Sequence, residues 1–378
     1  MSPRRQGRVD AIDAARGVAL LGMMLSHLGP RALVPPNVTE AIVDGRAAPL
    51  FALLAGVSLT LVHRGDPRGA GRVSATVVRA VILVVLGLWL GSQEEMPVFV
   101  ILAFYGLLIL VVLPARYLPT RWLVALTAAW AIGGPLVMLW IRTVHEPLYT
   151  VQPAWETLRH PGELLDLMTW AGAYPLVTWI AYLLAGLAVG RLALETGRVA
   201  TALVAGGAVL TVVPMLVAYL AIRQGWTDLE PTWRALFARD YYPDLPATRT
   251  DLWDVGPHTQ MPLNLISVIG SSLLVIGLCA LIRGRLPLVR DAGAMTLTLY
   301  VVHVVWTWRL YVEGDPATAY EDNAGWDVWG LQVAVLLGAA FVWRRFVWRR
   351  GPLEQVVRWL SVDGPNRVLS RTSENPRP

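Results

Sequence analysis

The chain has 378 residues, of which 55% are hydrophobic and 16% charged, with a mean hydropathy of +0.50; soluble proteins carry about a quarter charged residues, so this composition excludes an ordinary soluble protein. The net charge of +5 comes from 32 basic residues that are all arginine, which excludes lysine Schiff-base and lysine-nucleophile chemistry. The one cysteine, Cys279, excludes a disulfide framework or a redox pair within the chain. The net positive charge is divided between two sides of a membrane, so it gives no reason to expect nucleic acid as a partner.

Ten apolar runs approach or exceed the length that crosses a bilayer, which is about 20 residues for a helix. They are residues 14–30, 47–63, 75–92, 97–113, 121–141, 175–190, 199–222, 262–282, 292–311 and 327–343. The pattern predicts an all-α, polytopic integral membrane bundle of about ten transmembrane helices, with residues 1–351 as one domain. The first run lacks a small-residue cleavage site, so we expect it to be a span and not a removable signal peptide. Residues 352–378 are typical of an amphipathic cytoplasmic tail.

Arginine content alternates from loop to loop, as it does when every second loop faces the cytoplasm. One set of segments holds 23 arginines and 8 acidic residues, and the other holds 9 arginines and 19 acidic residues. The arginine-rich set is 1–16, 64–79, 114–121, 191–198, 283–291 and 344–378. Both termini are therefore predicted to be cytoplasmic, in a multi-pass protein of the plasma membrane. The long outer loops, 142–174 and 223–261, are expected either to face a polar partner or to act as spacers.

The first span carries ionisable residues, which are costly in hydrocarbon and mark function by default. Asp13, Arg16, Leu20, Met23 and His27 follow one another by three or four residues, so they lie along one helix face. That face would link a cytoplasmic cation to an imidazole in the outer half of the membrane. The alternative is a local pair of Asp13 with Arg16 and a histidine that only caps the outer end of the helix.

An aspartate precedes the second span. Asp44 lies just outside the membrane, close in sequence to the outer end of the first helix. A carboxylate that bonds one ring nitrogen of a histidine fixes its tautomer, so Asp44 is a candidate to orient His27. The alternative is an ordinary surface charge. In the sixth span, Gly186 and Gly190 have the small-xxx-small spacing that allows close packing of membrane helices.

The ninth span has a second polar face, on which Thr296, Tyr300, His303 and Thr307 follow at intervals of four, three and four residues. A tyrosine and a histidine on one stripe require partners within the bundle. If His303 meets His27, the pair forms a polar site in which a neutral imidazole can act as base or nucleophile. The alternative is a histidine satisfied by packing.

Four sequence blocks resemble those of a known family. They are RVDAIDAARGVALLGMMLSHLG at 8–29, DGRAAPLFALLAGVSL at 44–59, RDAGAMTLTLYVVH at 290–303 and RRFVWRRGPLEQVVRW at 344–359. All four resemble YeiB-type bacterial membrane proteins. The first two also resemble heparan-α-glucosaminide N-acetyltransferase and, more distantly, membrane acyltransferases that modify surface sugars.

This resemblance implies a bundle that takes an acyl group from cytoplasmic acetyl-CoA, or another acyl-CoA, and delivers it to a sugar or glycoconjugate on the outer side. Asp13 and Arg16 match the charged opening of the first motif, and His27 matches a late histidine of the acyltransferase relatives. Many YeiB-type members have asparagine at that place, and glutamine or serine near the position of His303. Histidine at both places favours the acyltransferases.

The residues themselves fit the same chemistry. Coenzyme A is an anion, and arginines on the inner surface would attract its phosphates. The candidates for donor binding are Asp13, Arg16, Arg72, Arg79, Arg285 and Arg290. We expect catalysis from His27 with His303 and Asp44, either by proton abstraction or through an acyl-imidazole. Tyr300 and Asn264 are candidate donors to the oxyanion or the acceptor.

Other functions are less well supported by the residues. No histidine has a partner at HExxH spacing, and no nucleotide-binding glycine motif is present, so neither a metal site nor a nucleotide fold is predicted. A transporter or lipid or glycan flippase is the alternative to an enzyme, and it would require broken helices around a polar cavity. The expected partners are the bilayer, the acyl-CoA and the acceptor, and the sequence determines no others. The oligomeric state is open between monomer and homodimer.

Overall fold

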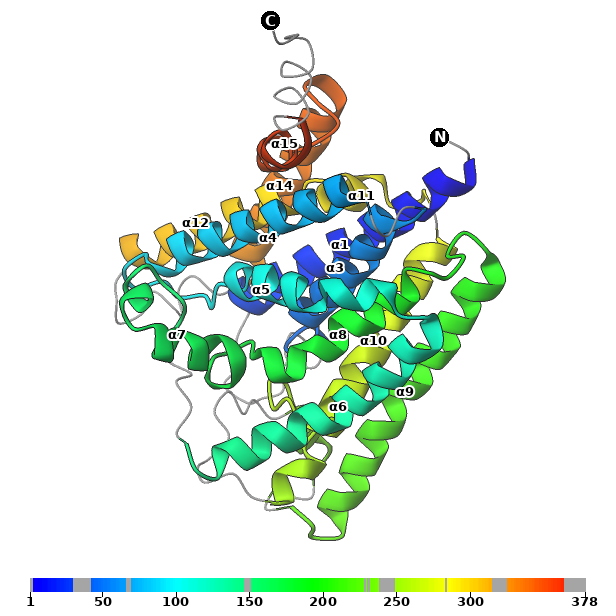
Figure 1. Cartoon of the computed structure of the whole chain (residues 1–378), viewed down its shortest axis with the longest axis vertical. Helices are drawn as coiled ribbons and strands as arrows, with labels where there is room; N and C mark the ends of the chain where they lie inside the picture. Colours follow the sequence, from blue (N-terminus) through cyan, green and yellow to red (C-terminus); the bar gives the residue numbers. More distant parts are fainter. Residues whose placement is uncertain are drawn as a thin grey trace, which may run out of the picture.

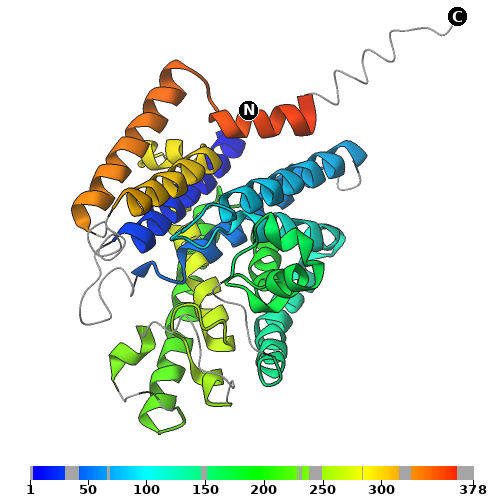
Figure 2. The same ribbon diagram turned by 90° about the vertical axis from the view of Figure 1, so that its left-hand side faces the viewer.

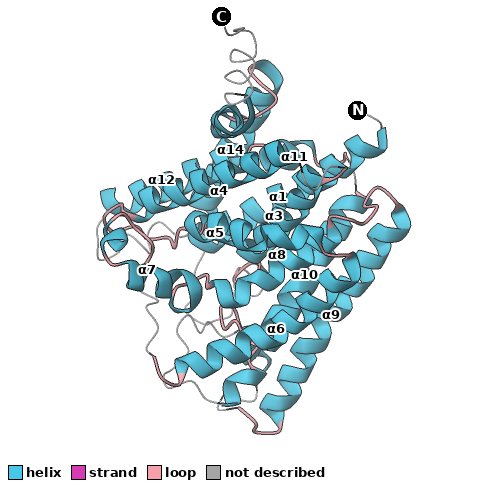
Figure 3. Cartoon of the chain, in the orientation of Figure 1, coloured by secondary structure: helices cyan, strands magenta, loops and turns pink. Residues whose placement is uncertain are grey.

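The structure, a computed structural model, describes residues 3–29, 42–65, 69–145, 151–227, 229, 232–237, 249–282, 284–314 and 325–363. Helices make up most of this part of the chain, and it contains no β-strand (Figure 3). The prediction of an all-α polytopic membrane bundle is confirmed. Residues 364–378, the end of the predicted amphipathic tail, lie outside the described residues.

The helices follow the predicted apolar runs in order. They are α1 (Pro3–Leu28), α3 (Ala47–His63), α4 (Ala70–Gly91), α5 (Leu102–Val112), α6 (Thr120–Arg142), α7 (Pro161–Asp166), α8 (Leu176–Val189), α9 (Gly197–Arg223), α10 (Pro262–Leu281), α11 (Pro287–Gly293), α12 (Thr296–Glu313), α14 (Trp326–Phe346) and α15 (Pro352–Arg358). Shorter 3₁₀ or π turns are η1 (Leu113–Tyr117), η2 (Glu156–Arg159), η3 (Leu167–Ala171), η4 (Trp233–Phe237), η5 (Arg249–Trp253) and η6 (Trp359–Asp363).

Six of these helices are long and apolar enough to cross a membrane, or eight if two bent pairs each form one span. The remaining predicted runs form shorter apolar helices, Ala47–His63 and Leu102–Tyr117. Each of the ten predicted runs thus contains helix in the structure, although residues 97–101 of the fourth run precede α5 and are not helical. Prolines near the starts of two runs occupy ordinary positions, because Pro175 precedes α8 and Pro262 is the first residue of α10, where no backbone N–H is needed.

Burial separates a central group of helices from a peripheral one. In α1 and α10, 61% of the most apolar window is buried inside the protein, whereas in α6, α9 and α14 the share is 17–22%. Helix α1 contacts α3, α10, α11, α12 and α14, so it lies at the centre of the bundle. Figures 1 and 2 show α1 among these helices and α9 along the outside. Most of each window in α6, α9 and α14 is therefore exposed on the outside of the bundle, as is typical of helices that face lipid.

Glycines bring α3 and α8 into close contact. A Cβ atom added at Gly186 would lie 2.0 Å from the carbonyl oxygen of Leu53, and one added at Gly56 would lie 2.2 Å from that of Leu183. Gly190 lies against Thr60 in the same crossing. The predicted small-xxx-small motif is a helix-packing element, as expected from its spacing.

Replacing Gly186 with Leu is therefore expected to destabilise the bundle by about 2 kcal/mol or more, because the side chain would displace the α3 backbone. The thermal unfolding midpoint of the detergent-solubilised protein measures this effect. Gly206→Leu is the matched control, since nothing lies within 4 Å of a Cβ atom at that α9 position. An equal loss in both variants would contradict the packing role.

The ninth predicted span is not one straight helix. The predicted run 292–311 begins at the end of α11 and continues as α12, and the two helices meet at an angle of 84° between Gly293 and Thr296. A Cβ atom added at Gly293 would lie 1.6 Å from the carbonyl oxygen of Asp13, and one added at Gly17 would lie 2.0 Å from that of Val289. The glycines let α11 lie directly on α1, and α12 then leaves in a different direction.

Candidate active site

Two histidines from distant parts of the chain meet inside the bundle. His27 is in the last turn of α1 and His303 is in the middle of α12. Nδ1 of His27 lies 2.8 Å from Nε2 of His303, and the rings are parallel with centroids 5.1 Å apart. We call these two residues the histidine pair. The two polar faces expected from the sequence thus meet at their histidines.

A third residue holds His303 from the other side. Oε1 of Gln332, on α14, lies 2.5 Å from Nδ1 of His303, and the hydroxyl of Thr307 lies 3.4 Å from the same nitrogen. His303 is fully buried and Gln332 is 1% exposed. The amide nitrogen of Gln332 is buried with no hydrogen-bond partner in the described part of the chain. In the described part of the chain, the Gln332 side chain therefore makes its hydrogen bond to His303.

These contacts indicate which ring nitrogen of each histidine carries a hydrogen. An amide oxygen can only accept, so Nδ1 of His303 carries a hydrogen and its Nε2 is the acceptor. When both rings are neutral, Nδ1 of His27 then donates to Nε2 of His303, and Nε2 of His27 carries the lone pair. A neutral imidazole in this tautomer can accept a proton or attack a carbonyl carbon.

A cavity of about 510 Å³ approaches the histidine pair from one direction. Ligand sites in proteins have volumes of about 300–1,000 Å³, so it is large enough for a small molecule or part of a larger one. It is lined by α1, α3, α4, α5, α12 and the C-terminal residues: Arg16, Met23, Phe51, Leu54, Ala55, Ser58, Leu59, Val62, Thr76, Arg79, Leu83, Ile101, Leu102, Tyr105, Ile109, Gly293, Ala294, Thr296, Leu297, Tyr300, Arg350, Glu354, Val357 and Arg358. We call it the central cavity.

One end of the central cavity is strongly basic. Arg16, Arg79, Arg350 and Arg358 line it, and Glu354 is the one acidic residue in the described lining. We call this the arginine end. Along α1, Arg16 and Met23 are seven residues apart, or about 10 Å, so this wall of the cavity changes from charged to apolar within two helical turns.

The opposite end of the cavity is apolar and stops close to the histidine pair. Met23 lies four residues before His27 on α1, and Tyr300 lies three residues before His303 on α12. Each interval is about one helical turn. The hydroxyl of Tyr300 accepts a hydrogen bond of 3.4 Å from the backbone N–H of Ile101, so its own proton can be donated to a ligand oxygen.

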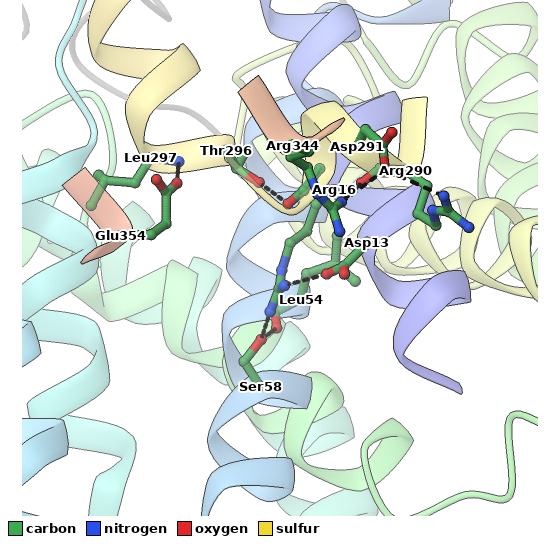
Figure 4. Close-up of polar contacts among 11 residues, drawn as sticks. Asp13, Arg16, Leu54, Ser58, Arg290, Asp291, Thr296, Leu297, Arg344 and Glu354 are labelled. Carbon is green, nitrogen blue, oxygen red and sulfur yellow. Dashed lines mark hydrogen bonds and ion pairs between the residues drawn. The ribbon is translucent and has the colours of Figure 1, made fainter. Parts of the chain in front are cut away.

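Arg16 is fixed in the wall of the cavity (Figure 4). Its Nη1 donates to Oδ1 of Asp13 at 2.8 Å, and its Nη2 donates to Oγ of Ser58 at 2.5 Å. Ser58 in turn donates to the carbonyl oxygen of Leu54. Asp13 therefore orients Arg16 and is absent from the cavity lining. The predicted local pair is present, and Arg16 also faces the cavity.

Of the other arginines that were predicted to bind the donor, one lines the central cavity and the others do not. Arg79 lines the cavity with Arg16, whereas Arg72 donates to the carbonyl oxygens of Val62 and Arg64. Arg290 pairs with Asp291, which also binds Arg344 at 2.9 Å. Figure 4 shows this second group beside Arg16. Arg285 is exposed. Arg72, Arg285 and Arg290 do not line the central cavity.

Two further candidates lie away from the cavity lining. Oδ1 of Asp44 lies 3.2 Å from Nε2 of His258, a histidine other than the expected His27. A contact of the orienting kind is made by Gln332 to His303, and the orientation of His27 by Asp44 stays a prediction. The amide of Asn264 donates to the carbonyl oxygens of Val255 and Gly256, so it holds the loop before α10.

Sequence reasoning missed three residues that this geometry makes prominent: Gln332, Arg350 and Arg358. Between Asp327 and Arg344 the glutamine stands alone among apolar residues, and that is the signal that could have indicated it. Both arginines lie in the last of the blocks that carried the family resemblance. Among the described residues, no group of three or more His, Cys, Asp or Glu side chains is arranged to hold a metal ion.

Comparison with known families gives one match. Residues 8–219 match the family model described as heparan-alpha-glucosaminide N-acetyltransferase, catalytic. The match covers more than half of the chain and includes His27, Arg16 and Arg79, whereas His303 and Gln332 lie outside it. No curated protein was found to match the chain.

Proposed function

The chain belongs to the family of the heparan-α-glucosaminide N-acetyltransferase catalytic domain, a family of transmembrane acetyltransferases, and on this premise we propose that it is an acyl-CoA-dependent acyltransferase. The donor is acetyl-CoA or another acyl-CoA that enters from the cytoplasmic side. The acceptor is a sugar or glycoconjugate on the outer side of the membrane.

One observation carries the proposal: the central cavity runs from four arginines to within one helical turn of the histidine pair. The phosphates of coenzyme A suit the arginine end, because guanidinium groups bind phosphate through paired hydrogen bonds. The apolar end suits the pantetheine arm and the acyl group. The thioester would then reach Nε2 of His27.

In the direct route, Nε2 of His27 takes the proton of the acceptor hydroxyl or amine as its oxygen or nitrogen attacks the thioester carbon. The carbon–sulfur bond breaks, and the imidazolium returns the proton to the departing thiolate. In the alternative route, Nε2 of His27 attacks the thioester carbon, the carbon–sulfur bond breaks and CoA leaves as the thiolate. The acceptor then attacks the acyl-imidazole, which frees His27, and the proton that the acceptor loses balances the one needed by the thiolate. In both routes we assign to Tyr300 the hydrogen bond that is donated to the oxyanion.

Donor binding and turnover test the proposal. The detergent-purified protein should be stabilised against heat by acetyl-CoA and not by acetate, and it should release free CoA thiol when an amino-sugar or glycolipid acceptor is added. Stabilisation follows from binding to the folded state alone. No stabilisation at millimolar acetyl-CoA would contradict the proposal.

The transporter or flippase alternative is kept because of the broken spans. The pairs α11–α12 and α7–α8 bend by 84° and 56°, as transporters with discontinuous helices do. The same assay separates the two functions. Binding of acyl-CoA without thiol release, with movement of labelled substrate into proteoliposomes, would favour transport.

A further inference from the structure

We propose that the C-terminal residues 350–363 form part of the donor site and bind the phosphates at the nucleotide end of acyl-CoA. We call this segment the C-terminal clasp. The inference rests on the proposed function, because it concerns the same donor. It assigns a role to a segment that lies well beyond the residues matched by the family model, which end at 219.

The clasp contributes directly to the wall of the central cavity. Arg350, Glu354, Val357 and Arg358 all line it. These residues lie before, within and at the end of α15, so one face of this helix covers the arginine end. Figure 1 shows α15 above α4 and α12, at the end of the molecule where the chain termini lie.

Glu354 fastens the clasp to the bundle. Its Oε1 accepts hydrogen bonds of 2.7 and 3.1 Å from the backbone N–H groups of Leu297 and Thr298, in the first turn of α12 (Figure 4). Its Oε2 accepts a bond of 2.5 Å from the hydroxyl of Thr298, and that hydroxyl accepts one from the N–H of Leu353. A carboxylate at a helix N-terminus is stabilised by the helix dipole.

A second contact joins the clasp to α4. Nε of Arg79 donates to Oγ of Ser361 at 3.4 Å, and Ser361 is 4% exposed. No hydrogen bond or ion pair in the described part of the chain uses the two terminal nitrogens of Arg79. These nitrogens are therefore available to a ligand in the cavity that Arg79 lines.

The arginine end brings several positive charges close together. Arg350 and Arg358 lie near enough to Arg79 for their positive charges to repel it. The single carboxylate in the described lining, that of Glu354, is already bound by the first turn of α12. An anion with several phosphates would relieve this repulsion, and its oxygens match the paired donors of guanidinium groups.

Two sources could supply such phosphates: the nucleotide end of acyl-CoA and the headgroup of an anionic lipid. Coenzyme A carries a 3′-phosphate that dephospho-CoA lacks, and adenosine 3′,5′-bisphosphate carries phosphates without the pantetheine arm. We assign the clasp to the nucleotide, because the cavity behind it continues toward the histidine pair.

Calorimetric titration of the full-length protein in neutral detergent tests this assignment, with CoA, dephospho-CoA and adenosine 3′,5′-bisphosphate as probes. Arg350→Gln and Arg358→Gln should each weaken CoA binding about tenfold or more, the loss of one charge-assisted pair. Arg358→Lys should recover part of the affinity. Arg349→Gln is the matched control, because Arg349 is exposed and does not line the cavity.

Glu354→Gln tests the fastening separately. The amide keeps one acceptor oxygen and loses the charge, so the apparent KM for acetyl-CoA should rise several-fold while kcat stays within about twofold. The thermal unfolding midpoint of the ligand-free variant shows whether the fold is retained. An unchanged KM in a folded Glu354→Gln protein would show that Glu354 does not position the clasp.

The outcomes separate the clasp from the proposed function. If the wild-type protein binds CoA and both glutamine variants bind it equally well, the clasp assignment is wrong and the acyltransferase proposal stands. If phosphatidylglycerol displaces no CoA yet its own binding is lost in the arginine variants, the clasp is a lipid site. If the wild type binds neither CoA nor the bisphosphate, both proposals fail.

Discussion

Replacing His27 with Ala is expected to lower acyl transfer at least about a thousandfold, because both routes require its Nε2 as base or nucleophile. Release of CoA thiol in the presence of acceptor measures the effect. Binding of acetyl-CoA should persist, since the central cavity ends about one helical turn before His27.

His160→Ala is the control for this variant, because His160 is an exposed residue before α7 and should leave the rate unchanged. Retained donor binding shows that His27→Ala is folded. Transfer by folded His27→Ala at the wild-type rate would remove His27 from the mechanism and leave the cavity as a binding site alone.

Gln332→Leu is expected to lower kcat by roughly 10- to 100-fold with little change in the KM for acetyl-CoA. Leucine cannot accept from Nδ1 of His303, so the ring loses the contact that fixes its tautomer and, through it, that of His27. The steady-state rate at saturating acetyl-CoA measures this loss. Gln332 acts through His303, so we regard it as a positioning residue.

Gln332→Glu separates this role from simple packing. A glutamate has nearly the same shape and keeps an acceptor oxygen toward His303, so it should retain much more activity than the leucine variant. Equal rates in Gln332→Leu and the wild type would contradict the assigned tautomers. Equal losses in Gln332→Leu and Gln332→Glu would contradict the role of the acceptor oxygen, because glutamate keeps that oxygen and the shape of the side chain.

The sequence predicted the bundle well because each membrane helix must satisfy its own backbone within one continuous apolar run. Periodicity also placed His27 and His303 on the inner faces of their helices. In the outer half of the membrane, the polar faces of these two helices contain no other strongly polar pair. A buried imidazole requires a hydrogen-bond partner, so a contact between the two histidines was one of the expected arrangements. The contact between them, which the sequence left open, is present in the structure. The family match confirms the resemblance carried by the N-terminal blocks.

The parts that the sequence did not predict depend on contacts between distant segments. The break between Gly293 and Thr296 follows from the close approach of α11 to α1, which helical periodicity cannot show. Positive charge in a loop indicates a side of the membrane and not a cavity, so Arg72, Arg285 and Arg290 could not be distinguished from Arg16 and Arg79. Asp44 lies in a loop, where no helical periodicity indicates which residues its side chain contacts.

The cytoplasmic location of both termini stays a prediction, and so does the domain boundary at residue 351. Arg350, Glu354 and Arg358 line the same cavity as Arg16, so the structure joins residues on both sides of that boundary in one site. The tail begins as the expected helix, α15, and its charged face is turned toward the cavity. Its exposed apolar side chains, Val356, Trp359 and Leu360, suit a membrane surface.

The most direct test of the central claim is an experimental structure of the protein with a non-transferable thioether analogue of acetyl-CoA. We expect the phosphates at Arg79 and Arg358 and the acyl carbon within reach of Nε2 of His27, with the pantetheine arm along the central cavity. An analogue bound outside this cavity, or with its acyl group at the arginine end, would contradict the account.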